Sequence, residues 1–362
     1  MAGVIGGRLV AIHHHHHTTL ISTPLPQFNI KLPAIHSRRA STMSATATTP
    51  TTALNNPTVQ HTTGTGSSSG CWSEFASNVS GEWDGYGADF TVDGNPIELP
   101  ENVVPNAYRE WEVHVFDWQT QCPTLAKPDN VYAMYKLIKL LPTVGCEADA
   151  ATRFSVEERV IGGADNMVSS FAYQSSGCYT AVWSTQKSAS SKVLELEHCL
   201  IDPRDKESRV RVIQILGVEG NHKLVLKSIK VFVEQWYGPF RNGEQLGGCA
   251  IRDSAFATTQ ALNGSEVSGV WQRSNSKASF QDSSNILQEL VAVDGLEKSV
   301  REKDGLVLLP KNLWSSMVEI DGEKTCCEVG WLLETGHAIT SKCVFLRNAE
   351  LKEIIMSSET AA

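Results

Sequence analysis

The feature that most constrains this chain is an alternation of apolar and polar residues with a period of two, which recurs from Trp72 onward. It is clearest over residues 223–236, KLVLKSIKVFVEQW, and it returns over residues 192–201. Half-buried antiparallel strands produce this alternation, and short turn-like stretches such as Asp202-Pro203-Arg204-Asp205 separate the runs. The sequence therefore predicts a mainly β protein with few helices.

Two further runs have a polar side that the pattern assigns to a solvent-facing surface. Residues 208–216 place Val210 and Val212 on one face and Arg209 and Arg211 on the other. Residues 108–118 predict a second such strand, which alternates Trp111, Val113 and Val115 with Glu110, Glu112 and His114.

The best candidate for a helix is the segment 128–141, PDNVYAMYKLIKLL. Asp129 or Asn130 could cap its start. A strand over the second half of the segment remains an alternative. Four of its apolar residues would fit one side of a helix: Tyr132, Tyr135, Leu137 and Leu141.

The pentapeptide pattern Val-Ser-Gly-x-Trp occurs twice, at residues 79–83 and 267–271. Each copy lies where a run of predicted strands begins. Glycine permits a tight turn, and a tryptophan behind it can fill the end of a β-barrel. We therefore expect two related β-domains, over residues 71–259 and 260–362. The residues that would close the barrel ends are Gly81 and Trp83 in the first domain and Gly269 and Trp271 in the second.

The first 73 residues contain no Asp or Glu and are rich in Ser and Thr. Acid-poor, Ser-rich N-termini are typical of organelle transit peptides, and the scarcity of Arg favours the plastid. We expect residues 1–70 to be a chloroplast transit peptide and flexible leader, and the remaining protein to lie in the stroma. The strong bases of this segment are Arg8, Lys31, Arg38 and Arg39.

Charge and cysteine usage exclude several classes of function. The chain has a net charge of −9, and loss of the +4 leader leaves −13, which argues against nucleic-acid binding. No apolar run approaches the roughly 18 residues of a membrane helix, so an integral membrane protein is not expected. The nine cysteines form no C-x-x-C pair, so we predict neither a metal site nor a disulfide framework.

Two short motifs resemble known families. Gly81-Glu82-Trp83 and Gly269-Val270-Trp271 resemble the Gly-x-Trp of lipocalin-like (calycin) barrels. Residues 308–310, Leu-Leu-Pro, and 328–332, Glu-Val-Gly-Trp-Leu, resemble the CpcS-type phycobiliprotein bilin lyases, over roughly residues 271–359. The resemblance implies two calycin antiparallel β-barrels in tandem, the second CpcS-like and suited to an open-chain tetrapyrrole. The Arg-x-Tyr strand of the lyases is absent after this motif, so we expect binding without catalysis.

The leading hypothesis is a soluble chloroplast lipocalin-like protein that binds an apolar or tetrapyrrole-like small molecule without catalysis. One alternative is an assembly or scaffold protein with filled barrels that meets a photosynthetic protein, and another is a bilin-lyase-like enzyme. No cofactor is certain, and a tetrapyrrole is the candidate ligand. Neighbouring Cys326 and Cys327 would point to opposite faces of a strand, which favours packing over redox chemistry. The candidate ligand-binding residues are Tyr86, Trp111, His114, Trp118, Glu328 and Trp331.

Overall fold

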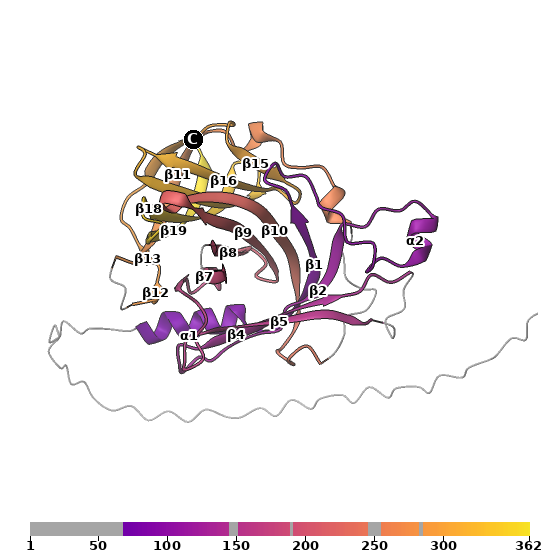
Figure 1. Ribbon diagram of the computed structural model, residues 1–362. Coiled ribbons are helices and arrows are strands. Elements are labelled where there is room, and N and C mark those ends of the chain that lie inside the picture. The colour runs from indigo at the N-terminus through magenta and orange to yellow at the C-terminus, as the bar shows by residue number, and fades with distance from the viewer. Residues whose placement is uncertain (1–67, 145–150, 189–190, 245–254, 282–284) are drawn as a thin grey trace, which may run out of the picture. The chain divides into compact units, whose positions relative to one another are not determined.

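The computed structural model describes residues 68–144, 151–188, 191–244, 255–281 and 285–362. Over these residues the protein is mainly β with few helices, as the alternation predicts (Figure 1). Nearly all of the predicted leader, residues 1–70, lies outside the described residues. No described helix is both long and apolar enough to cross a membrane.

The N-terminal sheet has 11 strands in the order β12-β6-β7-β8-β9-β10-β1-β2-β4-β3, and β5 pairs with β4. It curls into a half-barrel (Figure 1). No pairing between β5 and β6 closes it within the described residues. Its strands are β1 (Glu82–Phe90), β2 (Asp117–Gln121), β3 (Thr124–Ala126), β4 (Ala133–Leu140), β5 (Arg153–Ile161), β6 (Ser170–Tyr173), β7 (Tyr179–Ser188), β8 (Ser191–Ile201), β9 (Ser208–Glu219), β10 (Lys223–Gly238) and β12 (Leu287–Glu289).

Helix α1 (Ser68–Val79) connects the two ends of this curled sheet. The indole N–H of Trp72 donates to the Lys127 carbonyl beyond β3 at 2.7 Å, and Asn78 donates to the Ser175 carbonyl beyond β6 at 2.7 Å. Phe75 packs edge-on against Phe171 of β6. Because each end of the sheet binds α1, the helix holds the half-barrel in its curled form.

The C-terminal sheet has eight strands in the order β13-β11-β19-β18-β17-β16-β15, and β14 pairs with β11. The turn at Asp321-Gly322 joins β16 to β17, and both residues have positive φ. The strands are β11 (Gly269–Ser279), β13 (Val291–Ala292), β14 (Glu297–Arg301), β15 (Leu306–Leu309), β16 (Leu313–Ile320), β17 (Lys324–Glu334), β18 (His337–Leu346) and β19 (Leu351–Ala361).

One hydrophobic core runs between the two sheets. It includes Val212 of the N-terminal sheet together with Val329 and Ile354 of the C-terminal sheet. Polar pairs cross the same interface: Nδ1 of His198 lies 2.8 Å from the Ser341 hydroxyl. Strand β12, which follows β11 in the chain, pairs in parallel with β6 of the N-terminal sheet. The domain boundary expected at residue 259 remains a prediction.

The two Val-Ser-Gly-x-Trp segments have the same local geometry. The indole N–H of Trp83 donates to the carbonyl of Val79 at 2.9 Å, and that of Trp271 donates to Val267 at 2.8 Å. Both tryptophans are buried. The glycine of each segment has a positive φ, 143° at Gly81 and 115° at Gly269, a backbone conformation that residues with a side chain rarely adopt. The repeated sequence therefore encodes a repeated corner at the start of each sheet.

Two predictions of secondary structure were wrong. Residues 108–118 do not form one strand: helix α2 (Asn106–Glu110) and a turn precede β2, which starts at Asp117. The predicted helix over 128–141 is instead strand β4, in agreement with the strand alternative for its second half. Tyr135 and Leu137 are spaced by two as well as fitting a helical face, and pairing of β4 with β2, β3 and β5 decides between the two forms. The remaining helical turns are the 3-10 segments η2 (Gly220–His222), η3 (Phe256–Thr258) and η4 (Gly264–Glu266).

Candidate functional site

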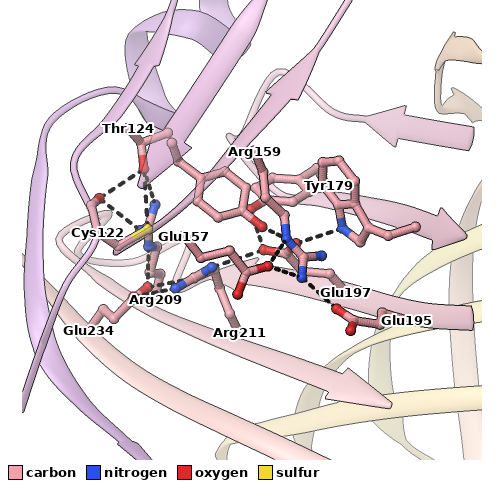
Figure 2. A network of polar contacts seen from close by, with 12 residues as sticks. Cys122, Thr124, Glu157, Arg159, Tyr179, Glu195, Glu197, Arg209, Arg211 and Glu234 are labelled. Carbon is pink, nitrogen blue, oxygen red and sulfur yellow. Dashed lines mark hydrogen bonds and ion pairs between the residues drawn. The ribbon is translucent and has the colours of Figure 1, made fainter. Parts of the chain in front are cut away.

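The concave face of the N-terminal sheet holds a network of fully buried charges (Figure 2). Arg209 and Arg211 project from β9, and Glu234 projects from β10. The Arg209 Nε donates to Glu234 Oε2 at 2.6 Å, and Arg211 Nη2 donates to Glu234 Oε1 at 2.8 Å. Burial alone would raise the pKa of Glu234, but the two guanidinium groups outweigh it and lower that pKa.

Glu197 of β8 is the second centre of this network. Its carboxylate accepts hydrogen bonds from Tyr179 at 2.8 Å, from the Trp183 indole at 2.9 Å and from Arg211 at 3.0 Å. Tyr135 also donates to it. Burial raises the pKa of a carboxyl, yet the neighbouring cations and donors leave the pKa of Glu197 lowered. Both buried carboxylates are therefore ionised and fully bonded.

This network corrects the prediction that the arginine side of residues 208–216 faces solvent. Arg209 and Arg211 are buried on the concave face, while Val212 and Gln214 pack toward the C-terminal sheet on the other. Strand β9 is covered on both faces, so it does not have one buried face and one solvent-exposed face. The charges are tolerated because each one is paired. Side chains that pair with one another occupy this concave face, and their arrangement does not resemble a simple ligand-binding site.

The face of the C-terminal sheet that is turned away from the core carries a second charged cluster, which lines a pocket of about 360 Å³. Arg301 Nη2 lies 2.6 Å from Glu359 and 3.2 Å from Glu328, and Lys342 Nζ lies 2.7 Å from Glu328. Arg273 Nε lies 2.8 Å from Glu359. Burial would raise the pKa of Glu328, but Lys342 and Arg301 lower it to about 2. Three cations thus meet two carboxylates within this cluster.

The same pocket has an apolar side and an unpaired donor. Leu306, Val318 and Ile320 form part of its lining, and the exposed Glu302 and Asp304 lie at its rim. The buried hydroxyl oxygen of Ser299 has no hydrogen-bond partner among the described residues. This arrangement can receive a molecule that has one acidic group and an apolar body.

Cys326 also lines the pocket, but its environment suppresses thiol chemistry. Burial raises the pKa of its thiol to about 11, so the nucleophilic thiolate is scarce at neutral pH. Cys327 is completely buried in the core between the sheets, with a pKa that burial also raises. The two neighbours therefore lie on opposite faces of β17, as the alternation predicts.

The Glu-Val-Gly-Trp-Leu segment of β17 supports this pocket. Glu328 accepts from the Trp314 indole at 3.2 Å. A Cβ on Gly330 would lie 2.0 Å from Trp314 Cζ2, so only glycine leaves room for that ring. The following Trp331 points to the other face of the strand. Leu332 N–H donates to the Asn312 carbonyl at 2.9 Å, which connects the segment to the turn after Leu-Leu-Pro.

No family model matches this sequence. No curated protein matches it either. A solved structure of a protein of unknown function from the DUF3598 family of the cyanobacterium Nostoc punctiforme is similar in fold, with 11% sequence identity and a TM-score of 0.48. The match covers 80% of this chain and 99% of the Nostoc chain.

The structure does not bring the four predicted ligand residues of the N-terminal sheet together. Trp111 follows α2 and is 60% exposed, and the exposed His114 lies 2.9 Å from the Glu98 carboxylate. Trp118 is buried and stacks on Phe154 with ring centroids 4.8 Å apart. Tyr86 is half-buried on β1 and packs against the main core. Their role in ligand binding stays a prediction.

Sequence reasoning found Glu328 in the pocket but missed its three cations. Arg273, Arg301 and Lys342 come from β11, β14 and β18, which are far apart in the chain. In the sequence each of these cations is an isolated basic residue in an ordinary strand, which gives no sign that the three converge. Among the described residues, no group of three or more His, Cys, Asp and Glu side chains could hold a metal ion.

Proposed function

We propose that the protein binds a small apolar acid, without catalysis, in the pocket on the face of the C-terminal sheet that is turned away from the core. The observation that carries this proposal is the convergence of three cations, Arg273, Arg301 and Lys342, beside an apolar wall and the unpaired Ser299 hydroxyl. A carboxylate of the ligand would pair with one of these cations, while Glu302 and Asp304 stay at the exposed rim. The volume of about 360 Å³ lies within the roughly 300–1,000 Å³ range of small-molecule pockets.

A tetrapyrrole with a propionate arm is the ligand class that we favour. Its carboxylate would pair with Arg273 or Lys342 and accept a hydrogen bond from Ser299. Its apolar rings would extend along Leu306 and Val318 toward the open side of the pocket. The high thiol pKa of Cys326 favours reversible binding over attachment to this cysteine.

We also propose that the two sheets are variants of calycin barrels and that the protein works in the chloroplast stroma. The paired Trp83 and Trp271 corners support the common origin of the sheets. The acid-free, Ser- and Thr-rich N-terminus supports the location.

Titration with biliverdin, followed by its visible absorption, tests the binding site. Biliverdin dimethyl ester is the matched control ligand because it lacks the free carboxylates. We expect wild-type protein to bind the acid and to bind the ester at least about tenfold more weakly, since a charge-assisted hydrogen bond contributes about 1.5–3 kcal/mol. We expect Arg273→Gln to lose the same factor for the acid only.

Arg204→Gln, at the exposed turn between β8 and β9, is the control variant and should bind like wild type. Equal affinity for acid and ester would show that charge pairing does not select the ligand. Absence of binding to either would reject the ligand-binding proposal and favour the scaffold alternative.

A further inference from the structure

A row of polar side chains crosses four neighbouring strands on the convex face of the N-terminal sheet. Asp84 of β1 is paired in register with Gln121 of β2 and with Gln235 of β10, which in turn faces Ser208 of β9. Gln121 donates to Asp84 at 3.3 Å, and Ser208 donates to Gln235 at 3.2 Å. The neighbours Trp83 and Arg209 point to the concave side, so this row belongs to the other face.

A cleft of about 710 Å³ lies over this row, between the two sheets. Its floor includes Asp84, Ser208 and Gln235, with Val210 and Val233 beside them. The opposite wall comes from the C-terminal sheet, and Tyr237, which is 53% exposed, also lines the opening. That wall consists of Lys311, Asn312, Trp331, Leu332 and Leu333.

The opposite wall is held in place by the backbone. Lys311 and Asn312 both have a φ of 60° in the tight turn between β15 and β16. The Asn312 carbonyl accepts from Leu332 N–H at 2.9 Å, and Leu313 pairs with Trp331. The half-buried Trp331 is therefore presented to the cleft by a fixed strand and turn.

The charge of the floor selects the kind of ligand. Asp84 is only 4% exposed, and burial raises its pKa to about 6; Glu82 and Glu234 add to this rise, and the hydrogen bond from Gln121 and the charge of Arg241 oppose it. Two cations line the cleft: Arg209, which is bound to Glu234 and lies over the Trp83 ring, and Lys311 of the opposite wall. A hydrogen-bond donor or cation placed on the floor would stabilise the desolvated carboxylate of Asp84.

The surroundings also favour a small molecule over a peptide strand. Strands β2, β1, β10 and β9 are consecutive neighbours in the sheet, so none of them offers a free edge in the cleft for strand addition. The volume falls within the range of small-molecule sites. The floor of the cleft presents side chains, and not backbone groups, to a ligand.

We propose that this cleft is a second ligand site, which binds a flat aromatic or heteroaromatic molecule whose amine or ring N–H donates to Asp84 while its ring packs against Trp331. This site is separate from the acid-binding pocket and does not depend on it.

Ligand-observed NMR on the full chain with three aromatic bases tests this site: tryptamine, benzamidine and 9-aminoacridine. Indole-3-propionate and benzoate are the matched acids with the same rings. We expect at least one base to bind, with affinity that rises between pH 5 and pH 7.5 as Asp84 ionises. Asp84→Asn and Trp331→Leu should each weaken that binding at least about tenfold.

Two cross-controls separate this proposal from the acid pocket. Arg273→Gln should leave binding of the base unchanged, and Asp84→Asn should leave biliverdin binding unchanged. Circular dichroism and thermal melting of each variant establish that it is folded. The proposal is overturned if all three bases fail to bind, if the matched acid competes equally well, or if a folded Asp84→Asn protein binds the base like wild type.

Discussion

The guanidinium carbon of Arg209 lies 4.2 Å from the centre of the Trp83 ring, at the buried corner where the N-terminal sheet begins. Arg301 stands in the same relation to Trp271 in the C-terminal sheet, at 5.4 Å. Each arginine also pairs with a buried carboxylate, Glu234 for Arg209 and Glu359 for Arg301. A repeated corner therefore combines a tryptophan, a stacked cation and its counter-ion.

Replacing Arg209 by Met should strongly destabilise the protein. The change removes the stacked cation and leaves the fully buried Glu234 with Arg211 as its one remaining cation among these pairs. Loss of one partner of a buried pair costs about 3–5 kcal/mol. Urea unfolding measures this loss. The free energy of unfolding of Arg209→Lys should lie between those of wild type and Arg209→Met, because lysine keeps the positive charge but lacks the planar guanidinium group. The exposed Arg204→Met should lower the free energy of unfolding less than Arg209→Met does, and equal effects at the two sites would contradict the argument.

Glu197→Gln should lower the free energy of unfolding more than the removal of any one neutral group that donates a hydrogen bond to Glu197. The substitution keeps the size of the side chain but removes the charge that balances Arg211 and accepts from Tyr135. We expect a loss of about 3–5 kcal/mol in the free energy of unfolding. Tyr135→Phe, which removes one hydrogen bond, should cost about 1–2 kcal/mol.

Glu219→Gln is the surface control for this experiment, because Glu219 forms an exposed pair with Lys227. It should change the free energy of unfolding far less than Glu197→Gln does, because solvent screens an exposed pair. If Glu197→Gln were as mild as this control, the buried network would contribute little to the stability of the fold.

His198 should make the protein less stable in mild acid. Burial between the sheets lowers its pKa to about 4, although Gln214, Glu197 and Glu328 oppose the shift. Between pH 6.5 and 4 the unfolded chain binds a proton that the folded protein does not, so this contribution to stability is present above pH 6.5 and decreases as the pH falls. The full loss is about 3 kcal/mol, of which about 2 kcal/mol should appear by pH 5.

Urea unfolding of His198→Gln at pH 7 and pH 5 isolates this contribution. The variant lacks the titrating ring, so its stability should fall less than that of wild type over this interval. His114→Gln, at an exposed loop position, is the control and should keep the wild-type pH dependence. A parallel decrease in wild type and His198→Gln would assign the acid sensitivity to other groups.

Gly330→Ala should destabilise the C-terminal sheet through a single contact. The added Cβ would lie 2.0 Å from Trp314 Cζ2, and overpacking of this kind costs about 1–3 kcal/mol. Trp314→Phe in the same chain should recover part of the loss, so the double-mutant cycle should show favourable coupling. Gly220→Ala, where a Cβ meets nothing within 4 Å, should stay within about 0.5 kcal/mol of wild type in urea unfolding. Additive effects at Gly330 and Trp314 would count against the clash.

The β class and the two matching corners could be predicted from the sequence. These properties are local. Alternation indicates which side of a strand is buried, and a glycine that can adopt a positive φ indicates a turn at the end of a strand. The segment 128–141 shows the limit of this reasoning, because Tyr135 and Leu137 fit a helical face as well as one face of a strand.

The positions of the charged side chains depend on the assembled sheets. The alternation assigns Arg209 and Arg211 to the solvent-facing side of β9, but they are buried because the N-terminal sheet curls over them and brings the ring of Tyr135 of β4 to 5.1 Å from the Arg211 guanidinium. Arg273, Arg301 and Lys342 likewise converge through strand pairing across distant parts of the chain. Whether a charged side chain meets water or a counter-ion depends on which strand lies opposite it, and that is a property of the assembled sheets.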